Sequence, residues 1–173
     1  MGGCDNAFDS IKSEVSQAVW MYYSLRNGIW TKVSEFPADN DNFSLRGGEA
    51  TVVKDGLILT LGGVNKKVFE EALNRNAYLA SSLANQSDSL ILRMKKEAKE
   101  YLLHDIEWYK FNSTIKVFNI KINSWTISGR IPQTALAGAT VVGNGKVIYV
   151  VNGEIKPGIR TPKIWKISLE QDD

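Results

Sequence analysis

Two side chains that could do chemistry stand close together near the end of the chain, in the stretch VNGEIKPGIR at residues 151–160. The carboxylate of Glu154 could take up and return a proton as a general acid or base. The planar guanidinium of Arg160 could bind a carboxylate through two parallel hydrogen bonds. The alternative interpretation is an ion pair that braces a loop, with Lys156 solvated beside it. The residues alone favour this bracing role, so the choice depends on the fold that carries the loop.

The same stretch contains residues suited to a stiff connection. A β-rich segment stops at Asn152-Gly153, after which Pro157 fixes the backbone φ angle and Gly158 permits a turn. We therefore expect a constrained loop that follows directly on a strand.

Other reactive residues form no comparable set. The sequence has one cysteine, Cys4, and one histidine, His104. A Cys-His or Ser-His-Asp site would depend on that single histidine, and a zinc cluster would lack ligands. We expect neither a metal nor an organic cofactor.

Composition describes a globular chain with enough apolar residues for one substantial core. Its 173 residues are 43% hydrophobic, and the formal net charge is +2. This charge is too small for a nucleic-acid interface, and the basic residues between Arg93 and Lys99 are interpreted as a solvated helix face. No run reaches the length of a membrane span, and the first residues lack the pattern of a signal peptide. We expect no nucleic-acid or membrane partner.

The elements that must position the loop belong to an internal repeat. The stretch ATVVKDGLILTLGG at residues 50–63 returns as ATVVGNGKVIYVVNG at residues 139–153. Each copy has two β-forming runs around a glycine-containing turn, which predicts a β-hairpin. A second unit also recurs, because GIWTKVSEFP at residues 28–37 resembles NSWTISGRIP at residues 123–132.

A third set of similar segments supplies the remaining strand of each unit: AVWMYYSL, IKVFNIKI and KIWKISLE. The order predicts a four-stranded unit made of a hairpin, a third strand and a fourth strand that carries a tryptophan. All five tryptophans are expected in the core, with Trp30 and Trp125 packed between neighbouring units. Gly2-Gly3 is interpreted as the end of an earlier second strand.

A helical insertion at residues 64–110 interrupts the repeat where a short loop would normally join two strands. Apolar residues at helical spacing predict one helix after Ser87-Asp88 and a shorter helix before it. These apolar residues are Val68, Phe69, Ala72, Leu73, Leu90, Ile91, Met94, Ala98, Tyr101 and Leu102. The helices either pack on the strands or form a lid beside a site, and both roles can hold together.

These features resemble a kelch β-propeller, an all-β fold in which four-stranded blades surround an axis. The double glycine that ends a second strand and the tryptophan of a fourth strand are typical of kelch repeats. The chain carries roughly two and a half blades, whereas a propeller closes with about four to eight. We therefore expect residues 1–173 to form a partial propeller, which needs the missing blades or another chain to close its ring.

The resemblance narrows to one family, the bacterial N-acetylneuraminate epimerases, also called sialic acid mutarotases. It is carried by GGVN at residues 62–65, by the helical insertion directly after it, and by NGEIKPGIRT at residues 152–161. Members of this family are six-bladed kelch propellers of the periplasm, although this chain shows no signal peptide. The resemblance implies that Glu154 and Arg160 are the active-site pair and that sialic acid is the ligand.

Two further residues are expected to bind the sugar. Arg46 lies in the connection from a fourth to a first strand, which opens on the same face as the Glu154 loop. Asn65 ends the GGVN motif that the resemblance includes. The resemblance thus implies a substrate site formed by Arg160, Arg46 and Asn65 around Glu154.

The chemistry of the sugar agrees with these residue types. Sialic acid carries a carboxylate on its anomeric carbon, and exchange of its anomers requires ring opening to the keto form and closure on the other face. Glu154 would act as the general acid and base, a contribution of roughly 10²- to 10⁴-fold, while Arg160 holds the carboxylate. With the resemblance, the catalytic interpretation is favoured over bracing, and the chain is a candidate isomerase if its propeller is complete.

Two alternatives use the same fold without this reaction. The loops could bind a protein, as in a kelch interaction module without catalysis. The chain could also be an inactive truncated propeller with an unfinished site. Saturable binding of sialic acid that depends on Arg160 separates the proposed enzyme from the interaction module.

Overall fold

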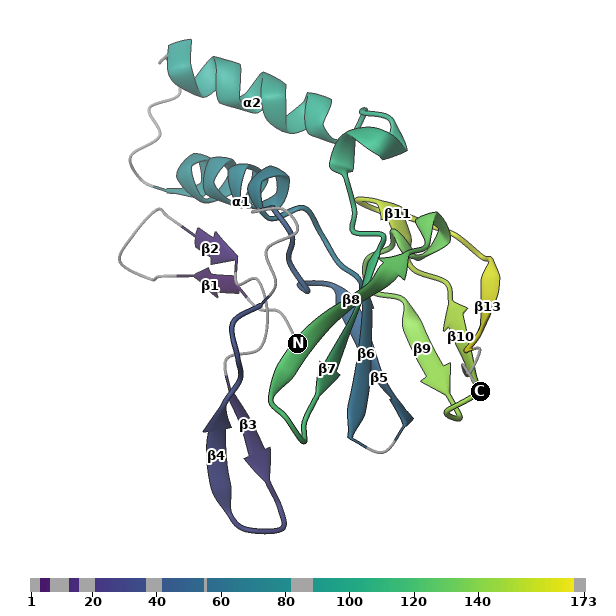
Figure 1. The fold of residues 1–173 in the computed structure, drawn as a ribbon. Coiled ribbons are helices and arrows are strands. Elements are labelled where there is room, and N and C mark those ends of the chain that lie inside the picture. Colours follow the sequence, from purple (N-terminus) through teal and green to yellow (C-terminus); the bar gives the residue numbers. More distant parts are fainter. Residues whose placement is uncertain are drawn as a thin grey trace.

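The structure is a computed structural model, and it describes residues 4–6, 13–15, 21–36, 42–54, 56–81 and 89–169. Within these ranges the chain is a set of antiparallel sheets with two helices gathered at one end (Figure 1). None of the described helices is long and apolar enough to cross a membrane.

The central sheet is the predicted complete blade. Its four antiparallel strands have the order β5-β6-β7-β8. They are Gly48–Lys54 (β5), Leu57–Gly62 (β6), Thr114–Asn119 (β7) and Ser124–Arg130 (β8). The hairpin, the third strand and the fourth strand therefore pair in the order that the repeat predicted.

The next blade has three strands in the order β13-β10-β9. They are Thr140–Gly143 (β9), Val147–Val151 (β10) and Ile164–Ser168 (β13). The first strands of the two blades, β5 and β9, lie side by side, as neighbouring blades of a propeller do (Figure 1). This arrangement confirms the prediction of a partial β-propeller.

Two smaller sheets precede the complete blade. Met21–Ser24 (β3) and Ile29–Lys32 (β4) form a two-stranded antiparallel sheet, as expected for the outer strands of an earlier blade. Cys4–Asn6 (β1) and Ser13–Val15 (β2) form a second pair that the sequence did not predict.

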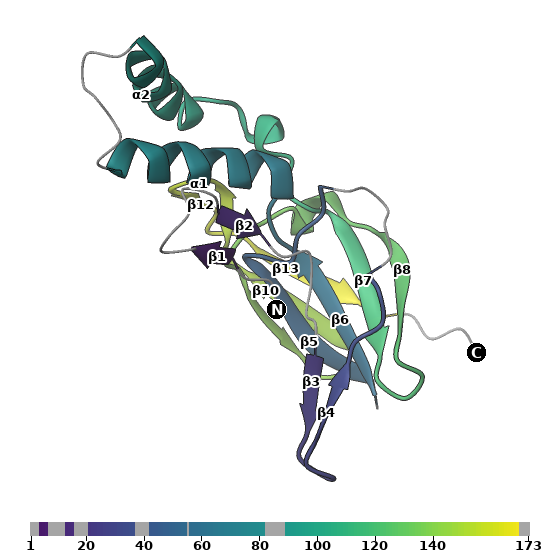
Figure 2. The same ribbon diagram turned by 90° about the vertical axis from the view of Figure 1, so that its left-hand side faces the viewer.

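The helical insertion lies between β6 and β7, as predicted. It contains Lys66–Ala80 (α1), Ser89–Tyr101 (α2) and a short 3-10 helix, Ile106–Tyr109 (η1). The two views show α1 and α2 together at one end of the blades, with β1 and β2 beside α1 (Figures 1 and 2). The backbone N–H of Val15 in β2 donates to Oε1 of Glu70 in α1 at 2.7 Å, so this hairpin is fastened to the insertion.

Some predictions fall on residues that the structure does not describe. Gly2-Gly3, Trp20 and the predicted helix start at Ser87-Asp88 lie outside the described ranges. The apolar face of α2 is nevertheless turned inward, since Ile91 is buried.

The main apolar core lies between the two larger blades. Alternate residues of the strands form most of it, because successive side chains of a strand point to opposite faces, and Leu136 and Ala139 join it from the connection before β9. Its buried members are Val53, Leu59, Leu61, Ile115, Leu136, Ala139, Ile148 and Val150. The core therefore fixes the two blades against each other and sets the positions of the loops at their ends.

A second cluster encloses a charged side chain. Lys116 of β7 is fully buried, and its Nζ lies 3.9 Å and 3.8 Å from the ring centroids of Phe36 and Phe43. Both rings belong to the segment that leads into the central blade. The faces of the rings carry partial negative charge and attract the ammonium group, so the lysine links this segment to β7.

The prediction that every tryptophan lies in the core is wrong. Trp125 packs on Phe118, its cross-strand partner in the same blade, and on Phe36 of the preceding segment, with ring centroids 4.9 Å apart in both pairs. Trp30 is 62% exposed and Trp108 is 40% exposed. Trp30 is exposed because its sheet, β3-β4, has only two strands in the described part of the chain. The indole ring therefore lacks the cover that a complete blade and its neighbour would give.

The double glycine at the end of β6 meets neighbouring backbone directly. Gly62 and Gly63 have φ angles of 70° and 101°, which favour glycine. A Cβ atom on Gly63 would overlap the carbonyl oxygen of Ser44, and one on Gly62 would meet that of Leu136. The double glycine thus lies where neighbouring backbone approaches too closely for a side chain.

We expect the Gly63→Ala substitution to lower the free energy of unfolding by about 3 kcal/mol or more, because it combines backbone strain with overlap against a fixed carbonyl. Urea unfolding measures the loss. Gly158→Ala is the matched control, since Gly158 also has a positive φ of 76° but no atom within 4 Å of the added carbon. It should cost only about 1–2 kcal/mol. Equal losses in both variants would contradict the role of close approach.

Candidate functional site

The loop of Glu154 and Arg160 is a short β-hairpin at the helical end of the blades. Glu154–Lys156 (β11) pairs with Ile159–Arg160 (β12), and Glu154 lies directly opposite Arg160. Pro157 and Gly158 form the two-residue turn, with the proline before a glycine of positive φ, as a type II turn requires. Residues directly opposite in a hairpin have neighbouring side chains, so this pairing brings the acid and the arginine together.

The chain enters this hairpin through two residues with left-handed backbone conformations. Asn152 and Gly153 have φ angles of 58° and 107°, and they turn the chain from the end of β10 into β11. Gly153 packs closely on Leu136 and Ala139 of the inter-blade core. The hairpin is therefore held at a fixed angle to the blade.

Glu154 and Arg160 form an ion pair, with 3.7 Å between Oε1 and Nη1. The arginine side chain is 53% exposed and the glutamate side chain is 35% exposed, so both remain open to a ligand. Arg160 also donates from Nη2 to the carbonyl oxygen of Gly138 at 2.6 Å. One edge of the guanidinium is thus anchored while the group stays at the surface.

Backbone hydrogen bonds join the loops of neighbouring blades around this pair. Glu154 and Ala137 exchange both backbone bonds, at 2.7 Å and 3.0 Å. The N–H of Gly138 donates to the carbonyl of Gly47 at 2.6 Å. Because Gly47 follows Arg46, this chain of bonds fixes the Arg46 connection relative to the hairpin.

A cavity of about 430 Å³ opens beside Glu154. Its polar lining residues are Arg46, Asn76, Tyr101 and Glu154. Its apolar lining residues include Val64, Phe69, Ala72, Leu73, Phe111 and Pro157. The cavity thus has charged groups on the hairpin and the Arg46 loop, and an apolar wall on α1.

Arg46 lies where the sequence placed it, on the same cavity as Glu154. Its guanidinium carbon is 5.2 Å from the centroid of the Phe69 ring. This contact between a cation and an aromatic face holds the arginine at the junction of the charged and apolar sides. Arg46 is therefore a cation in the lining of the cavity, whereas Arg160 does not line it and instead contacts the lining residues Glu154 and Gly138.

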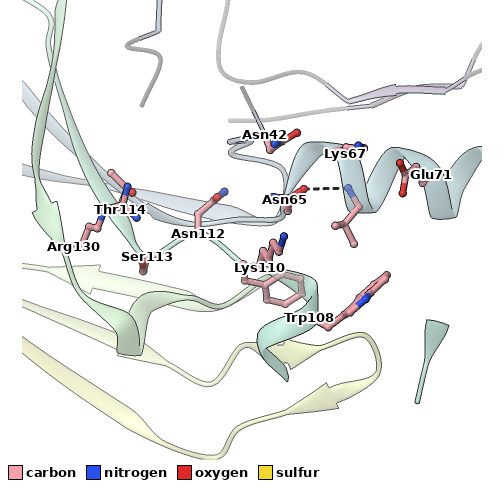
Figure 3. A pocket seen from close by; sticks show the side chains of 12 residues that line it. Asn42, Asn65, Lys67, Glu71, Trp108, Lys110, Asn112, Ser113, Thr114 and Arg130 are labelled. Carbon is pink, nitrogen blue, oxygen red and sulfur yellow. Dashed lines mark hydrogen bonds between the residues drawn. The ribbon is translucent and has the colours of Figure 1, made fainter. Parts of the chain in front are cut away.

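Asn65 lies elsewhere. It is buried and caps the N-terminus of α1, where its side-chain oxygen accepts a hydrogen bond from the Val68 N–H at 3.1 Å (Figure 3). It lines a separate cavity of about 620 Å³ between α1 and the segment that enters β7. In this structure Asn65 therefore caps the helix whose later residues line the Glu154 cavity, and its predicted contact with the sugar stays a prediction.

Sequence reasoning missed three polar groups of the site. Asn76 of α1 and Tyr101 at the end of α2 line the cavity, although the helical pattern gave Tyr101 only a packing role. Lys156 was interpreted as solvated, but its Nζ donates to the carbonyl oxygen of His104 at 2.9 Å. This bond ties the hairpin to the helical insertion. The position of the insertion could have indicated these three residues, because the insertion leaves the blade at the same end as the Glu154 hairpin.

Tyr101 is held in its neutral form. Burial raises its pKa to about 12, the neighbouring Tyr109 and Glu154 add to the rise, and Arg75 opposes it. The guanidinium carbon of Arg75 lies 5.3 Å from the centroid of the Tyr101 ring. The phenol is therefore a hydroxyl that can donate a hydrogen bond to a ligand at neutral pH.

The raised pKa predicts a loss of stability at high pH. Tyr101 ionises near 10 in the unfolded chain and near 12 in the folded chain, so the folded state binds more protons between these values. Its contribution to the free energy of unfolding is complete below about pH 10 and falls as the pH rises towards 12. Urea unfolding at about pH 9 and about pH 11 should show a smaller fall for Tyr101→Phe than for the unmodified chain. An equal fall in both chains would contradict this assignment.

Comparison with known proteins shows the family to which the chain is similar. The family model of N-acetylneuraminate epimerase matches residues 1–173. An N-acetylneuraminate epimerase of Salmonella paratyphi B is 26% identical over 171 residues, which are 99% of this chain and 41% of that protein. One from Escherichia coli O157:H7 is 28% identical over 148 residues, or 85% of this chain and 36% of that protein.

A solved structure supports the fold. The structure of YjhT matches with a TM-score of 0.75 and 23% identity, over 96% of this chain and 44% of the YjhT chain. The described chain therefore has the arrangement of part of a larger propeller. It spans 41% of the length of the Salmonella relative.

Proposed function

Because the chain belongs to the N-acetylneuraminate epimerase family, we propose that its cavity binds N-acetylneuraminate and that Glu154 and Arg160 exchange the α and β anomers of this sugar. The observation that carries the proposal is the cross-strand pairing of these two residues, 3.7 Å apart, beside a cavity. An acid and a guanidinium so close together can act on one carbon atom. The anomeric carbon of this sugar carries both the carboxylate and the hydroxyl that such a pair would recognise.

In the first step, the two arginines Arg160 and Arg46 bind the carboxylate of the sugar. Arg160 offers a planar fork of donors to the sugar carboxylate, and its anchoring bond to Gly138 fixes the direction of the fork. Arg46 adds positive charge from the neighbouring loop. When the carboxylate displaces Glu154 from Arg160, the glutamate is released beside the anomeric hydroxyl.

Proton transfer then opens the ring. The Glu154 carboxylate takes the proton of the anomeric hydroxyl while the bond between the anomeric carbon and the ring oxygen breaks, and the protonated Glu154 delivers this proton to the ring oxygen. The product is the open keto form. Rotation about the adjoining carbon–carbon bond presents the other face of the ketone. On closure Glu154 takes the proton of the attacking hydroxyl as its oxygen bonds to the carbonyl carbon, and it returns this proton to the new anomeric oxygen, so atoms and charge balance over the cycle.

The test follows the α anomer directly after a sialidase releases it. Proton NMR measures its approach to anomeric equilibrium with and without the chain. A rate that rises in proportion to the chain concentration supports the proposal. A rate equal to that of buffer, in a chain shown to be folded, contradicts it and favours the inactive truncated propeller.

One observation favours a second candidate, the interaction module. The face of the β9-β10-β13 sheet turned away from the core exposes Val142, Tyr149 and Ile164. This face also carries the exposed Lys166, opposite Tyr149, and its three apolar side chains could pack against another blade or another chain. We propose that the missing blades of the ring or a partner chain pack there. Sugar binding that is saturable and lost in Arg160→Ala would argue against a module that only binds protein.

A further inference from the structure

The α1 helix presents one continuous stripe to the cavity. The stripe consists of Phe69, Ala72, Leu73 and Asn76, which follow the i, i+3, i+4, i+7 spacing of one helix face. Three of these residues are apolar, and the last carries an amide. This stripe, called the α1 wall below, carries no charged side chain although Glu154 and Arg46 line the same cavity.

The sizes of the side chains give the wall a shape. Ala72 is buried and contributes only a methyl group, whereas Phe69, one turn before it, and Leu73, the next residue, are larger and half-buried. Phe69 is further held by the Arg46 guanidinium, 5.2 Å from its ring centroid. A small apolar group can therefore rest at Ala72, next to these two bulkier side chains. Asn76, one turn further along the helix, can bond a polar atom next to that group.

The cavity therefore suits a ligand with an acid at one end and a small acyl amide at the other. N-acetylneuraminate has this distribution, because its anomeric carbon, C2, carries the carboxylate and C5 carries an acetamido group. C2 and C5 lie directly across the six-membered ring from each other. A sugar with C2 at Glu154 and Arg160 thus turns its C5 substituent away from the hairpin.

We propose that the α1 wall recognises the acetamido group, with the acetyl methyl on Ala72 and its neighbours and the amide bonded to Asn76. This inference rests on the proposed function, since it uses the same sugar in the same cavity. It makes the helical insertion the element that determines specificity. The wall selects N-acylated acidic sugars over the analogue that has a hydroxyl group at C5, which would leave the apolar recess unfilled.

Saturation-transfer NMR tests the orientation without any catalytic step. With N-acetylneuraminate in excess over the chain, we expect the strongest transfer at the acetyl methyl protons. The pattern should persist in Glu154→Gln, which removes the proposed base. The strongest transfer at the glycerol side chain or at the C3 protons would overturn the inference and leave the proposed function standing. Absence of transfer to every sugar proton would reject the proposed ligand itself.

Variants on α1 locate the contact. Ala72→Leu fills the recess and should weaken binding of N-acetylneuraminate about tenfold or more while leaving the C5-hydroxyl analogue nearly unchanged. The matched control is Ala77→Leu, at an exposed position of the same helix. Asn76→Ala gives a second readout at an exposed residue that does not disturb the core. Equal weakening of both sugars by Ala72→Leu, or no change with either wall variant, would overturn the assignment.

Discussion

A chain with Glu154 replaced by glutamine exchanges the anomers of N-acetylneuraminate about 10²- to 10⁴-fold more slowly than the unmodified chain, the range expected for loss of a general acid and base. Glutamine keeps the size and hydrogen-bonding reach of glutamate but cannot take up the hydroxyl proton. Because the side chain is partly exposed and outside the apolar core, the fold should survive. The rate is measured by NMR after release of the α anomer.

The control for this variant is Glu107→Gln. Glu107 is an exposed acid on η1 of the helical insertion, and it does not line the cavity. Its substitution should leave the rate unchanged. A Glu154→Gln chain with an unmodified rate, or an equal loss in both variants, would remove Glu154 from the reaction.

Replacement of Arg160 by alanine should weaken binding of the sugar roughly 10- to 100-fold. The estimate comes from the roughly 1.5–3 kcal/mol that a hydrogen bond to a charged group contributes. Arg160→Lys should recover part of this affinity, because lysine keeps the charge but lacks the planar fork. Titration calorimetry with N-acetylneuraminate measures both variants.

Arg93→Ala is the matched control for Arg160. Arg93 also pairs with a glutamate, Glu97, at 3.6 Å, but it lies on an exposed face of α2. Its loss should not change affinity for the sugar. Unchanged affinity in Arg160→Ala would return the Glu154 and Arg160 pair to a bracing role.

The repeat predicted the blades because strand pairing depends on local patterns that recur. The two hairpin copies became β5-β6 and β9-β10, and their turn glycines lie where the chain reverses. The pairing of Glu154 with Arg160 could not be predicted from the turn alone. A regular two-residue turn at Pro157-Gly158 would place Ile155 opposite Arg160, and a register irregularity between Glu154 and Lys156 brings Glu154 there instead.

The lining of the cavity could not be predicted from the same patterns. Helical spacing shows which residues of α1 and α2 share a face, but the element that each face meets depends on how the insertion packs on the rim. The pattern therefore gave Tyr101 a packing role and left Asn76 without one, although both line the cavity. Asn65 was predicted to bind the sugar, but its side chain accepts a hydrogen bond from the Val68 N–H and caps the N-terminus of α1.

The exposure of Trp30 and the burial of Lys116 have a related cause. Whether an outer-strand tryptophan is covered depends on a neighbouring blade, and the described part of the chain has only two strands there. A lysine in a strand is expected at the surface, but Phe36 and Phe43 come from a distant segment to enclose it. Contacts between segments far apart in sequence decide both outcomes.

One measurement tests most directly whether a single cavity both holds and deprotonates the sugar. N-acetylneuraminate labelled with carbon-13 at the carboxyl carbon, C1, and at the anomeric carbon, C2, is placed with the chain at anomeric equilibrium. We predict a shift of the C1 signal and exchange cross-peaks between the C2 signals of the two anomers. Glu154→Gln should keep the C1 shift and lose the exchange, whereas Arg160→Ala should lose the C1 shift. Exchange that persists in Glu154→Gln, or a C1 shift that persists in Arg160→Ala, would contradict the account.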